Sequence, residues 1–474
     1  MVDLIRKSAT EILMLLRRDE VSPFELLDAL ESRIMAVDPL IGALPTLCFD
    51  RARERAFSLM RKPSHARGPL AGLPVAIKDL IDLAGVRTTY GSPIFKHHVP
   101  ASSDILVENL EAKGAIIYAK SNTPEFGAGG NTFNEVFEPT RNPWNTSLSA
   151  AGSSGGAAAA LATGTAWLAH GSDMGGSLRN PASFCGVVGL RPTPGRVAAT
   201  PGFRIDDTLS VEGPMARNIE DLALFLDALS GHHPADPLSL PAPAVTFLDG
   251  LHAAPSPKRI AYSKDLGITT VNPEVARITE AAARRFENLG AAVENAHPDF
   301  SEVHDCFHVL RARSFAVGLK DHYDHHRHLL KPEIVWNVEQ GLALTSEDVI
   351  RAERQRRALF MRSVEFFQRY DLLLTPATIL PPFPLEQRYP ESLEGRQFSN
   401  YVEWLAIAYA VTLVCCPALS LPCGWTASGL PVGLQIVGPR LGEAAVLKAG
   451  VMLESQLGFS ESVPIDPRPS LQAC

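Results

Sequence analysis

Short apolar segments that alternate with helix-forming segments are the feature that most constrains the fold of this chain. Leu73–Ile77 is typical of a buried strand, Asp104–Lys113 of a helix, and Ala115–Ala119 of the next strand. Strands separated by helices pair in parallel and are covered on both sides. We therefore predict the α/β class, with a mixed, mostly parallel central sheet covered by helices on both faces. Further strands are expected at Ile260–Tyr262, Ala291–Val293, Leu372–Leu374, Ala418–Leu421 and Val432–Val437.

Helix-capping signals mark the N-terminal part of the chain. Ser8 stands three residues before Glu11. Ser22 stands three residues before Glu25, with a proline at the first helical position. A serine followed by a glutamate at this spacing supplies two reciprocal hydrogen bonds at a helix start, so two helices are predicted before residue 39. Residues 232–257, rich in proline, alanine and serine, are interpreted as a surface loop rather than a domain hinge.

Charge and cysteine content exclude several classes of protein. The net charge is −8, so no basic surface is expected to bind nucleic acid. Seven cysteines without paired spacing fit reduced thiols in a cytoplasmic protein better than a disulfide framework. Charged residues interrupt the apolar positions at the N-terminus, and no apolar run reaches the roughly 18 residues of a membrane span. We expect a cytoplasmic monomer or homodimer that handles neither nucleic acid nor membrane.

Two segments of small residues around serine indicate a candidate catalytic site. One spans residues 149–160 and the other spans residues 171–179. Small residues let the backbone approach a substrate closely, although a tight turn before an alanine-rich helix explains the first segment equally well. In the second segment, Gly175, Gly176 and Ser177 leave consecutive backbone N–H groups free to converge on an oxyanion.

The base that would activate a serine is not obvious from these two segments. A serine hydroxyl is a poor nucleophile without one. Gly152-x-Ser154-x-Gly156 has the letters of a nucleophile elbow, but the segment before it is too polar for the strand that this motif requires. No Ser-x-x-Lys motif occurs, and His170 precedes the second segment without belonging to it. Lys78 ends an apolar strand, where a solvated charge is the simpler explanation for it alone.

Taken together, these residues resemble the amidase signature family. The resemblance covers most of the chain, is densest from about residue 69 to residue 231, and returns at 373–377 and 417–438. In that family a lysine, a bridging serine and a nucleophilic serine follow one another along the chain. The bridge lies 75 residues after the lysine in many members, and the nucleophile lies 24 after the bridge. Lys78, Ser153 and Ser177 have both spacings.

The resemblance implies a role for each matching residue. Lys78 is the base, Ser153 the bridge and Ser177 the nucleophile of an amidohydrolase that forms an acyl-enzyme and uses no metal or cofactor. The bridging serine follows a cis peptide bond in this family, here Gly152–Ser153. Backbone N–H groups form the oxyanion hole, here those of Met174, Gly175, Gly176 and Ser177. A further set of side chains orients the bridge and the hole, here Ser154, Asp173 and Arg179.

The resemblance also suggests how the chain is divided. A single domain of residues 1–474 is predicted, with N-terminal helices (1–65), a signature core (66–240), a variable substrate-shaping region (241–410) and C-terminal core strands with a helix (411–474). The chain departs from the family's usual residues at three places, which bear on the shape of the substrate cavity. Ala151 and Glu138 stand where glycine is common, and Val414-Cys-Cys-Pro417 replaces an Asn-x-x-Gly-x-Pro arrangement.

Three further groups of residues have simpler explanations than a site. His322 and His326 would share a helical face, but the surrounding run is strongly polar, which favours a solvated helix over a metal site. Cys185 is interpreted as a small core residue because a reactive thiolate needs a charged partner. Of the aromatic residues in the variable region, two or three are expected to line an acyl pocket. These aromatic residues are Phe307, Phe315, Trp336, Phe366, Phe367, Tyr401 and Trp404.

The predicted activity is hydrolysis of a carboxylic amide in a small molecule, with anilides, esters and carbamates or urethanes as related substrates. The alternative is the glutaminase subunit of a tRNA-dependent amidotransferase, which has the same fold. Relatives of that kind carry a stretch resembling Tyr-Gly-Arg-Val-Ser-Arg-Tyr-Gly followed by a Ser-Leu-Asp-Gln run. Residues 194–207 are instead Pro-Gly-Arg-Val-Ala-Ala-Thr-Pro-Gly-Phe-Arg-Ile-Asp-Asp, and this difference favours the amidohydrolase.

Overall fold

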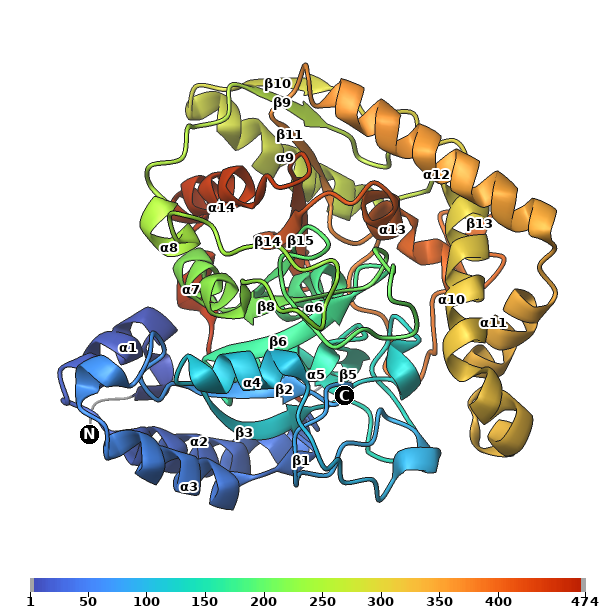
Figure 1. Cartoon of the computed structure of the whole chain (residues 1–474). Helices are drawn as coiled ribbons and strands as arrows, with labels where there is room; N and C mark the ends of the chain where they lie inside the picture. Colours follow the sequence, from blue (N-terminus) through green and yellow to red (C-terminus); the bar gives the residue numbers. More distant parts are fainter. Residues whose placement is uncertain (1–3, 470–474) are drawn as a thin grey trace, which may run out of the picture.

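A computed structural model, which describes residues 4–469, centres on one eleven-stranded sheet (Figure 1). Every strand that the sequence predicts is present in it. Across the sheet the strands are, in order, β1 (Thr46–Leu47), β3 (Ile116–Ser121), β2 (Pro74–Lys78), β6 (Leu168–Asp173), β8 (Val211–Ala216), β7 (Val188–Arg191), β14 (Ala418–Trp425), β15 (Pro431–Val437), β11 (Leu372–Pro376), β9 (Arg259–Tyr262) and β10 (Ala292–Asn295). Two small ladders lie outside it, β4 (Arg141–Asn142) with β5 (Asn145–Ser149) and β12 (Ser392–Leu393) with β13 (Arg396–Gln397).

The direction of pairing differs between the flanks and the middle of the sheet. Strands β3, β2 and β6 pair in parallel at one flank, where the edge strand β1 pairs antiparallel with β3, and β11, β9 and β10 pair in parallel at the other flank. The strands between β6 and β11 pair antiparallel. β14 and β15 are joined by a short turn with no helix between them, so they can only form a hairpin. The predicted mixed α/β sheet is confirmed, and its parallel pairs lie where helices connect the strands.

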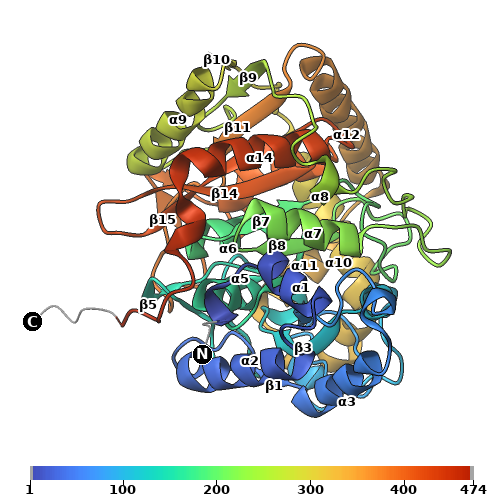
Figure 2. The ribbon, with the colours of Figure 1, turned by 90° about the vertical axis from the view of Figure 1, so that its left-hand side faces the viewer.

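Helices cover both faces of the sheet. On one face α7 (Ile219–Leu229), α9 (Pro273–Asn288) and α14 (Glu443–Leu457) pack against the strands, and Figure 2 shows α7 and α14 crossing in front of them. On the other face lie α5 (Gly155–Thr163) and α6 (Arg179–Cys185). Two glycines of the β14–β15 hairpin show that α6 and α9 lie on opposite faces of the sheet, since Gly433 lies against Ser183 of α6 and Gly424 lies against Ile278 of α9. The remaining helices near this body are α1 (Ala9–Arg17), α2 (Pro23–Val37), α3 (Phe49–Met60), α4 (Ile105–Ala112) and α8 (Phe247–Gly250).

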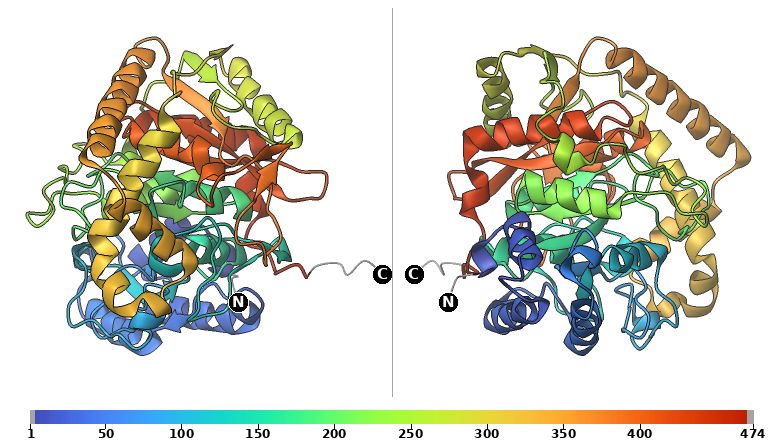
Figure 3. Two further views of the ribbon diagram at one scale, coloured as in Figure 1. Left: turned by 90° about the vertical axis from the view of Figure 1, so that its right-hand side faces the viewer. Right: turned by 60° about the vertical axis from the view of Figure 1, so that its left-hand side comes forward.

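A separate layer of long helices flanks the sheet. It consists of α10 (Val303–His326), α11 (Pro332–Leu342) and α12 (Ser346–Phe366). Helix α10 packs against both of the others, and Figures 1 and 3 show α10 and α11 side by side. The short α13 (Ala406–Leu413) lies between α10 and the rest of the molecule. The three long helices therefore form an additional layer beside the sheet and the helices that cover it.

The capping signals behave as predicted. Ser8 accepts a hydrogen bond from the Glu11 amide while the Glu11 carboxylate accepts one from the Ser8 amide, and Ser22 with Glu25 repeats this arrangement. Residues 232–257, predicted to be a loop, contain the short helix α8. Thr246 caps this helix, because its hydroxyl accepts a hydrogen bond from the Asp249 amide. No helix within residues 4–469 is long and apolar enough to cross a membrane. Six cysteines are free thiols, and Cys474 lies outside the described residues.

Candidate active site

Lys78 occupies a closed corner at the end of strand β2. The strand is buried along its whole length, and the lysine side chain is 0% exposed. Its Nζ lies 2.7 Å from Ser153 Oγ, 3.0 Å from Ser154 Oγ and 3.0 Å from Ser172 Oγ. Burial lowers the pKa of Lys78 to about 7, although nearby carboxylates act in the opposite direction. The amine is therefore poised between its charged and neutral forms near physiological pH.

The segment that carries Ser153 connects β5 to α5. Its Gly152–Ser153 peptide bond is cis, as the family resemblance predicts. Gly152 leaves no room for a larger residue, because a Cβ there would lie 3.0 Å from the backbone of Asn131. Ala151 has a φ of 57°, in the left-handed region that favours glycine, which explains why glycine is the commoner residue at this place. This backbone course presents the Ser153 hydroxyl to Lys78.

The segment that carries Ser177 connects β6 to α6 and is tied to the first. The Ser154 amide donates to the Ser177 carbonyl oxygen over 3.2 Å. Exposure falls from Ser177, which is half-buried, to Ser153 at 2% and Lys78 at 0%. The three residues thus form a series that leads from the cavity to the interior.

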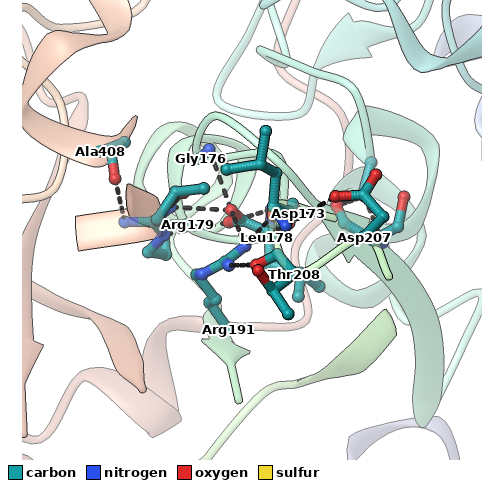
Figure 4. A network of polar contacts seen from close by, with 12 residues as sticks. Asp173, Gly176, Leu178, Arg179, Arg191, Asp207, Thr208 and Ala408 are labelled. Carbon is teal, nitrogen blue, oxygen red and sulfur yellow. Dashed lines mark hydrogen bonds and ion pairs between the residues drawn. The ribbon is translucent and has the colours of Figure 1, made fainter. Parts of the chain in front are cut away.

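Asp173 holds the Ser177 segment in place through a charged network, shown in Figure 4. Its carboxylate lies 2.7 Å from Arg179 Nη2 and 3.3 Å from Arg191 Nη1, and it accepts from the amides of Gly176 and Leu178 over 3.1 Å each. Burial by itself would raise the pKa of Asp173, but the two guanidinium groups lower it well below its usual range. Arg179 also donates to the carbonyl of Ala408 and to the side chain of Gln435. The network therefore joins the loop after β6 to α6, β7, α13 and β15.

A cavity of about 450 Å³ opens onto this corner. Met174, Gly175 and Ser177 line it from one side, and residues 193–207 supply much of another side. Three of the seven aromatic candidates line it, as predicted, namely Phe307, Phe315 and Tyr401. The other four, Trp336, Phe366, Phe367 and Trp404, do not belong to its lining. Three aromatic residues that the sequence did not single out also line it, namely Tyr90, Phe126 and Phe203.

Comparison with known proteins agrees with this geometry. The family model described as Amidase matches residues 25–447. The chain belongs to the amidase signature family. It is 33% identical to an acylamidase of Rhodococcus erythropolis over 467 residues, 97% of each chain. It is 34% identical over 489 residues to a glutamyl-tRNA(Gln) amidotransferase subunit from Moorella thermoacetica, which covers 98% of this chain and 99% of that one. The crystal structure of a bacterial aryl acylamidase matches with a TM-score of 0.90 and 27% identity, over 96% of this chain and 97% of that one. This protein is thus an amide-hydrolysing enzyme.

Three polar residues of the amidase site were not predicted from the sequence. Ser172 supplies the third hydroxyl to Lys78, and the only signal for it was its place inside the second small-residue segment. Arg191 binds Asp173 from a strand whose sequence carries no motif. Glu212 lies 2.8 Å from His170 and belongs to the cavity lining. Its negative charge partly offsets the lowering of the Lys78 pKa by burial. All three come from strands that become neighbours only in the folded sheet.

The residues with simpler explanations lie as follows. His322 stacks on Phe126 with ring centroids 5.9 Å apart and contacts the edge of Phe95. Within residues 4–469 no three side chains of histidine, cysteine or carboxylate type come together as a metal site would need. Cys185 is fully buried in the core, as predicted, and burial raises the pKa of its thiol. The departures from the family pattern at Ala151, Glu138 and 414–417 do not belong to the cavity lining.

Proposed function

We propose that this amidase acts alone, as an amidohydrolase that cleaves carboxylic amide bonds through an acyl-enzyme on Ser177. The observation that carries the proposal is the 2.7 Å contact between Lys78 Nζ and Ser153 Oγ, inside a corner whose burial lowers the pKa of the amine to about 7. Neutral Lys78 takes the proton of Ser153 as Ser153 takes the proton of Ser177. The Ser177 oxygen then attacks the carbonyl carbon of the amide.

Backbone amides stabilise the oxyanion that forms in this step. We assign that role to the amides of Met174, Gly175 and Ser177, which line the cavity. The amide of Gly176, expected as a fourth donor, is directed at Asp173 instead and fixes the loop. Ser154 and Asp173, the latter with Arg179, hold the bridge and the loop in position. Removal of one such donor typically lowers the rate by about 10²–10³-fold.

The second half of the reaction reverses the proton path. The proton on Lys78 returns through Ser153 to the leaving nitrogen, the carbon–nitrogen bond breaks, and the amine departs. Water then attacks the acyl ester of Ser177 along the same path and releases the acid. Anilides, esters and carbamates or urethanes can pass through the same steps. Neither metal nor cofactor takes part in the proposed sequence.

A second candidate function is the glutaminase subunit of a tRNA-dependent amidotransferase. The 34% identity with such a subunit over nearly the whole chain favours it. Residues 194–207, which differ from the stretch typical of those subunits, lie along the cavity, where a difference changes the substrate. This position of the divergent segment supports the free-standing amidohydrolase. We accordingly propose a cytoplasmic monomer or homodimer that acts on a small molecule and binds neither nucleic acid nor membrane, in keeping with the net charge of −8.

The test uses the purified full chain with no partner protein and no tRNA. The protein should hydrolyse at least some compounds in a panel of simple amides, anilides, carbamates and esters. A serine-directed fluorophosphonate should label Ser177. Labelling is located by mass spectrometry of the digested protein, with Ser177→Ala as the matched unlabelled control. Labelling elsewhere, or turnover that appears only with partner subunits, would contradict the proposal.

A further inference from the structure

Arg311 is a buried cation in the wall of the cavity. Its side chain belongs to α10, the residue is 7% exposed, and it is part of the cavity lining. One terminal nitrogen, Nη2, donates to the Tyr401 hydroxyl over 2.7 Å, and the other, Nη1, donates to the side-chain oxygen of Asn337. The guanidinium carbon lies 4.3 Å from the ring centroid of Phe315. Both hydrogen-bonding partners are neutral, and these bonds use two of the five N–H donors of a guanidinium.

Two other charged residues of the cavity lining, Arg204 and Asp82, already have polar partners. Arg204 pairs with Asp206 at 2.8 Å. Asp82 accepts a hydrogen bond from the Tyr90 hydroxyl over 2.6 Å. Arg311, by contrast, forms no ion pair with any residue in the range 4–469.

The carboxylate of the adjacent helix is also engaged elsewhere. Glu333 lies one turn of α11 before Asn337, and it is held by Arg388 through two hydrogen bonds of 2.7 and 2.6 Å. The next cation along this side, Lys331, donates to the carbonyl of Ala128. A buried charge without a counter-charge is costly, so the missing negative group is expected to come from what the cavity binds.

The helix sets the distance between this charge and the reacting centre. Phe307, Arg311 and Phe315 stand four residues apart, share one face of α10 and all line the cavity. Phe307 lies beside the loop that carries Gly175 and Ser177, because its Cζ is 3.7 Å from where a Cβ of Gly175 would be. Four residues of helix rise by about 6 Å, so Arg311 follows that contact by about one turn.

We propose that Arg311 binds a carboxylate of the substrate, so that this enzyme prefers amides with a carboxylate a few bonds from the scissile carbonyl. A guanidinium matches a carboxylate with two parallel hydrogen bonds, and that of Arg311 is held between two rings of the cavity lining, 4.3 Å from the centroid of Phe315 and 5.4 Å from that of Tyr401. The cleavage of such substrates rests on the function proposed above. The recognition of the carboxylate is a binding property that can be measured without turnover.

The experiment compares charged and neutral ligands of the same length on the inactive Ser177→Ala protein. The charged probes are succinamate, glutaramate and adipamate, and the neutral probes are the matching diamides. Isothermal titration should show at least one charged probe binding about tenfold or more tightly than its diamide. Arg311→Met in the same background should remove the preference. Arg204→Met, a second arginine of the cavity lining that already has a carboxylate partner, should leave the ratio of the two affinities as it was.

Two results would overturn the assignment. One is equal binding of charged and neutral probes for all three lengths, and the other is a preference that survives Arg311→Met with the protein still folded by circular dichroism. If Arg311→Met does not fold, the three probe pairs on Ser177→Ala decide alone. Because binding is measured on an inactive protein, failure of the proposed hydrolysis and failure of carboxylate recognition are separate outcomes.

Discussion

Two regions of the cavity are built from opposite kinds of residue. The relay corner, by which we mean Lys78, Ser153 and Ser177 with their loops, consists of small side chains and backbone in close contact. The α10 wall, by which we mean Phe307, Arg311 and Phe315, consists of large side chains on one long helix. In the corner a single added carbon collides, as at Gly176, where a Cβ would lie 2.7 Å from that of Ala408. At the neighbouring Gly175, by contrast, an added Cβ would be in ordinary contact with Phe307 and Leu405, at 3.7 and 3.8 Å.

This difference teaches which part of the protein sets the reaction and which sets the choice of substrate. The corner tolerates few substitutions because neighbouring atoms fill the space around it, such as the backbone of Asn131 at Gly152 and the Cβ of Ala408 at Gly176. The wall can exchange side chains at the cost of side-chain packing alone. Substitutions in the corner should therefore lower the turnover of every substrate, whereas substitutions in the wall should reorder the substrates.

The largest effect is expected in the corner for Ser177→Ala, which removes the proposed nucleophile. The value of kcat should fall by about 10⁴–10⁶-fold for every substrate, charged or neutral. Steady-state kinetics with a matched amide and ester would measure it. The melting temperature serves as the control and should change little, because only one half-buried oxygen is lost. A variant that keeps its activity on one class of substrate would break the comparison.

Much of the relay corner was predictable because its residues lie on segments with narrow sequence requirements. The resemblance to the amidase signature family singled out Lys78, Ser153 and Ser177, and the structure brings Lys78 and Ser153 into contact. The strands and the first two helix starts were predictable for a similar reason, since apolar runs and capping boxes act locally. The catalytic roles of Lys78, Ser153 and Ser177, and the division of the chain into regions, stay predictions.

The α10 wall was not predictable beyond its aromatic residues. Helix α10 carries polar and apolar residues nearly all around its circumference, so no stripe announces which face meets the cavity. Arg311 is recognisable only through Asn337 and Tyr401, which are 26 and 90 residues away. The antiparallel pairing in the middle of the sheet was not predicted for a related reason, because strand order depends on contacts between distant segments.

The next largest effect distinguishes two tasks within the corner. Lys78→Ala removes both the activation of Ser177 and the return of a proton to the leaving group. An amine leaves only when its nitrogen is protonated, whereas an activated ester departs with little help. The ratio of kcat/KM for an amide over that for an ester with the same acyl group should therefore fall by about tenfold or more. An equal loss on both, with acylation rate-limiting for each, would mean that Lys78 does not serve the leaving group.

A smaller, graded effect should follow from pH. The pKa of Lys78 is lowered to about 7 by burial, and only the neutral amine acts as a base. The value of kcat/KM should rise as pH increases through about 7 and then level off, falling roughly tenfold per unit on the acidic side. Charged and neutral substrates should share the same midpoint, since it belongs to the corner. A maximum well below about pH 6 in folded protein would contradict a lysine base.

In the wall a milder substitution should alter only the ranking of substrates. Tyr401→Phe removes the hydroxyl that accepts from Arg311, which leaves the guanidinium less firmly placed. The preference for charged over neutral probes should fall by about two- to tenfold. Tyr118→Phe, which removes a buried hydroxyl bonded to the carbonyl of Thr165, is the control and should leave that preference unchanged. An equal change in both variants would show a general loss of packing instead.

The smallest effect is expected from chelators. The proposed base is a lysine and the proposed oxyanion donors are backbone amides, so prolonged treatment with EDTA should leave kcat/KM unchanged. Loss of activity that zinc restores would return attention to His322 and His326 and would link turnover to the far end of α10.

The three hydroxyl groups around Lys78 have a consequence for the motion that the proposed relay requires. An ammonium group has three hydrogens to give, whereas a neutral amine has two hydrogens and one lone pair. Ser153, Ser154 and Ser172 surround Nζ at 2.7 to 3.0 Å, and a hydroxyl reverses its role by rotating about its own C–O bond. One set of oxygen positions therefore suits both protonation states. The charge can arrive and leave while the heavy atoms stay where they are, and no rearrangement of the surroundings need accompany each proton transfer.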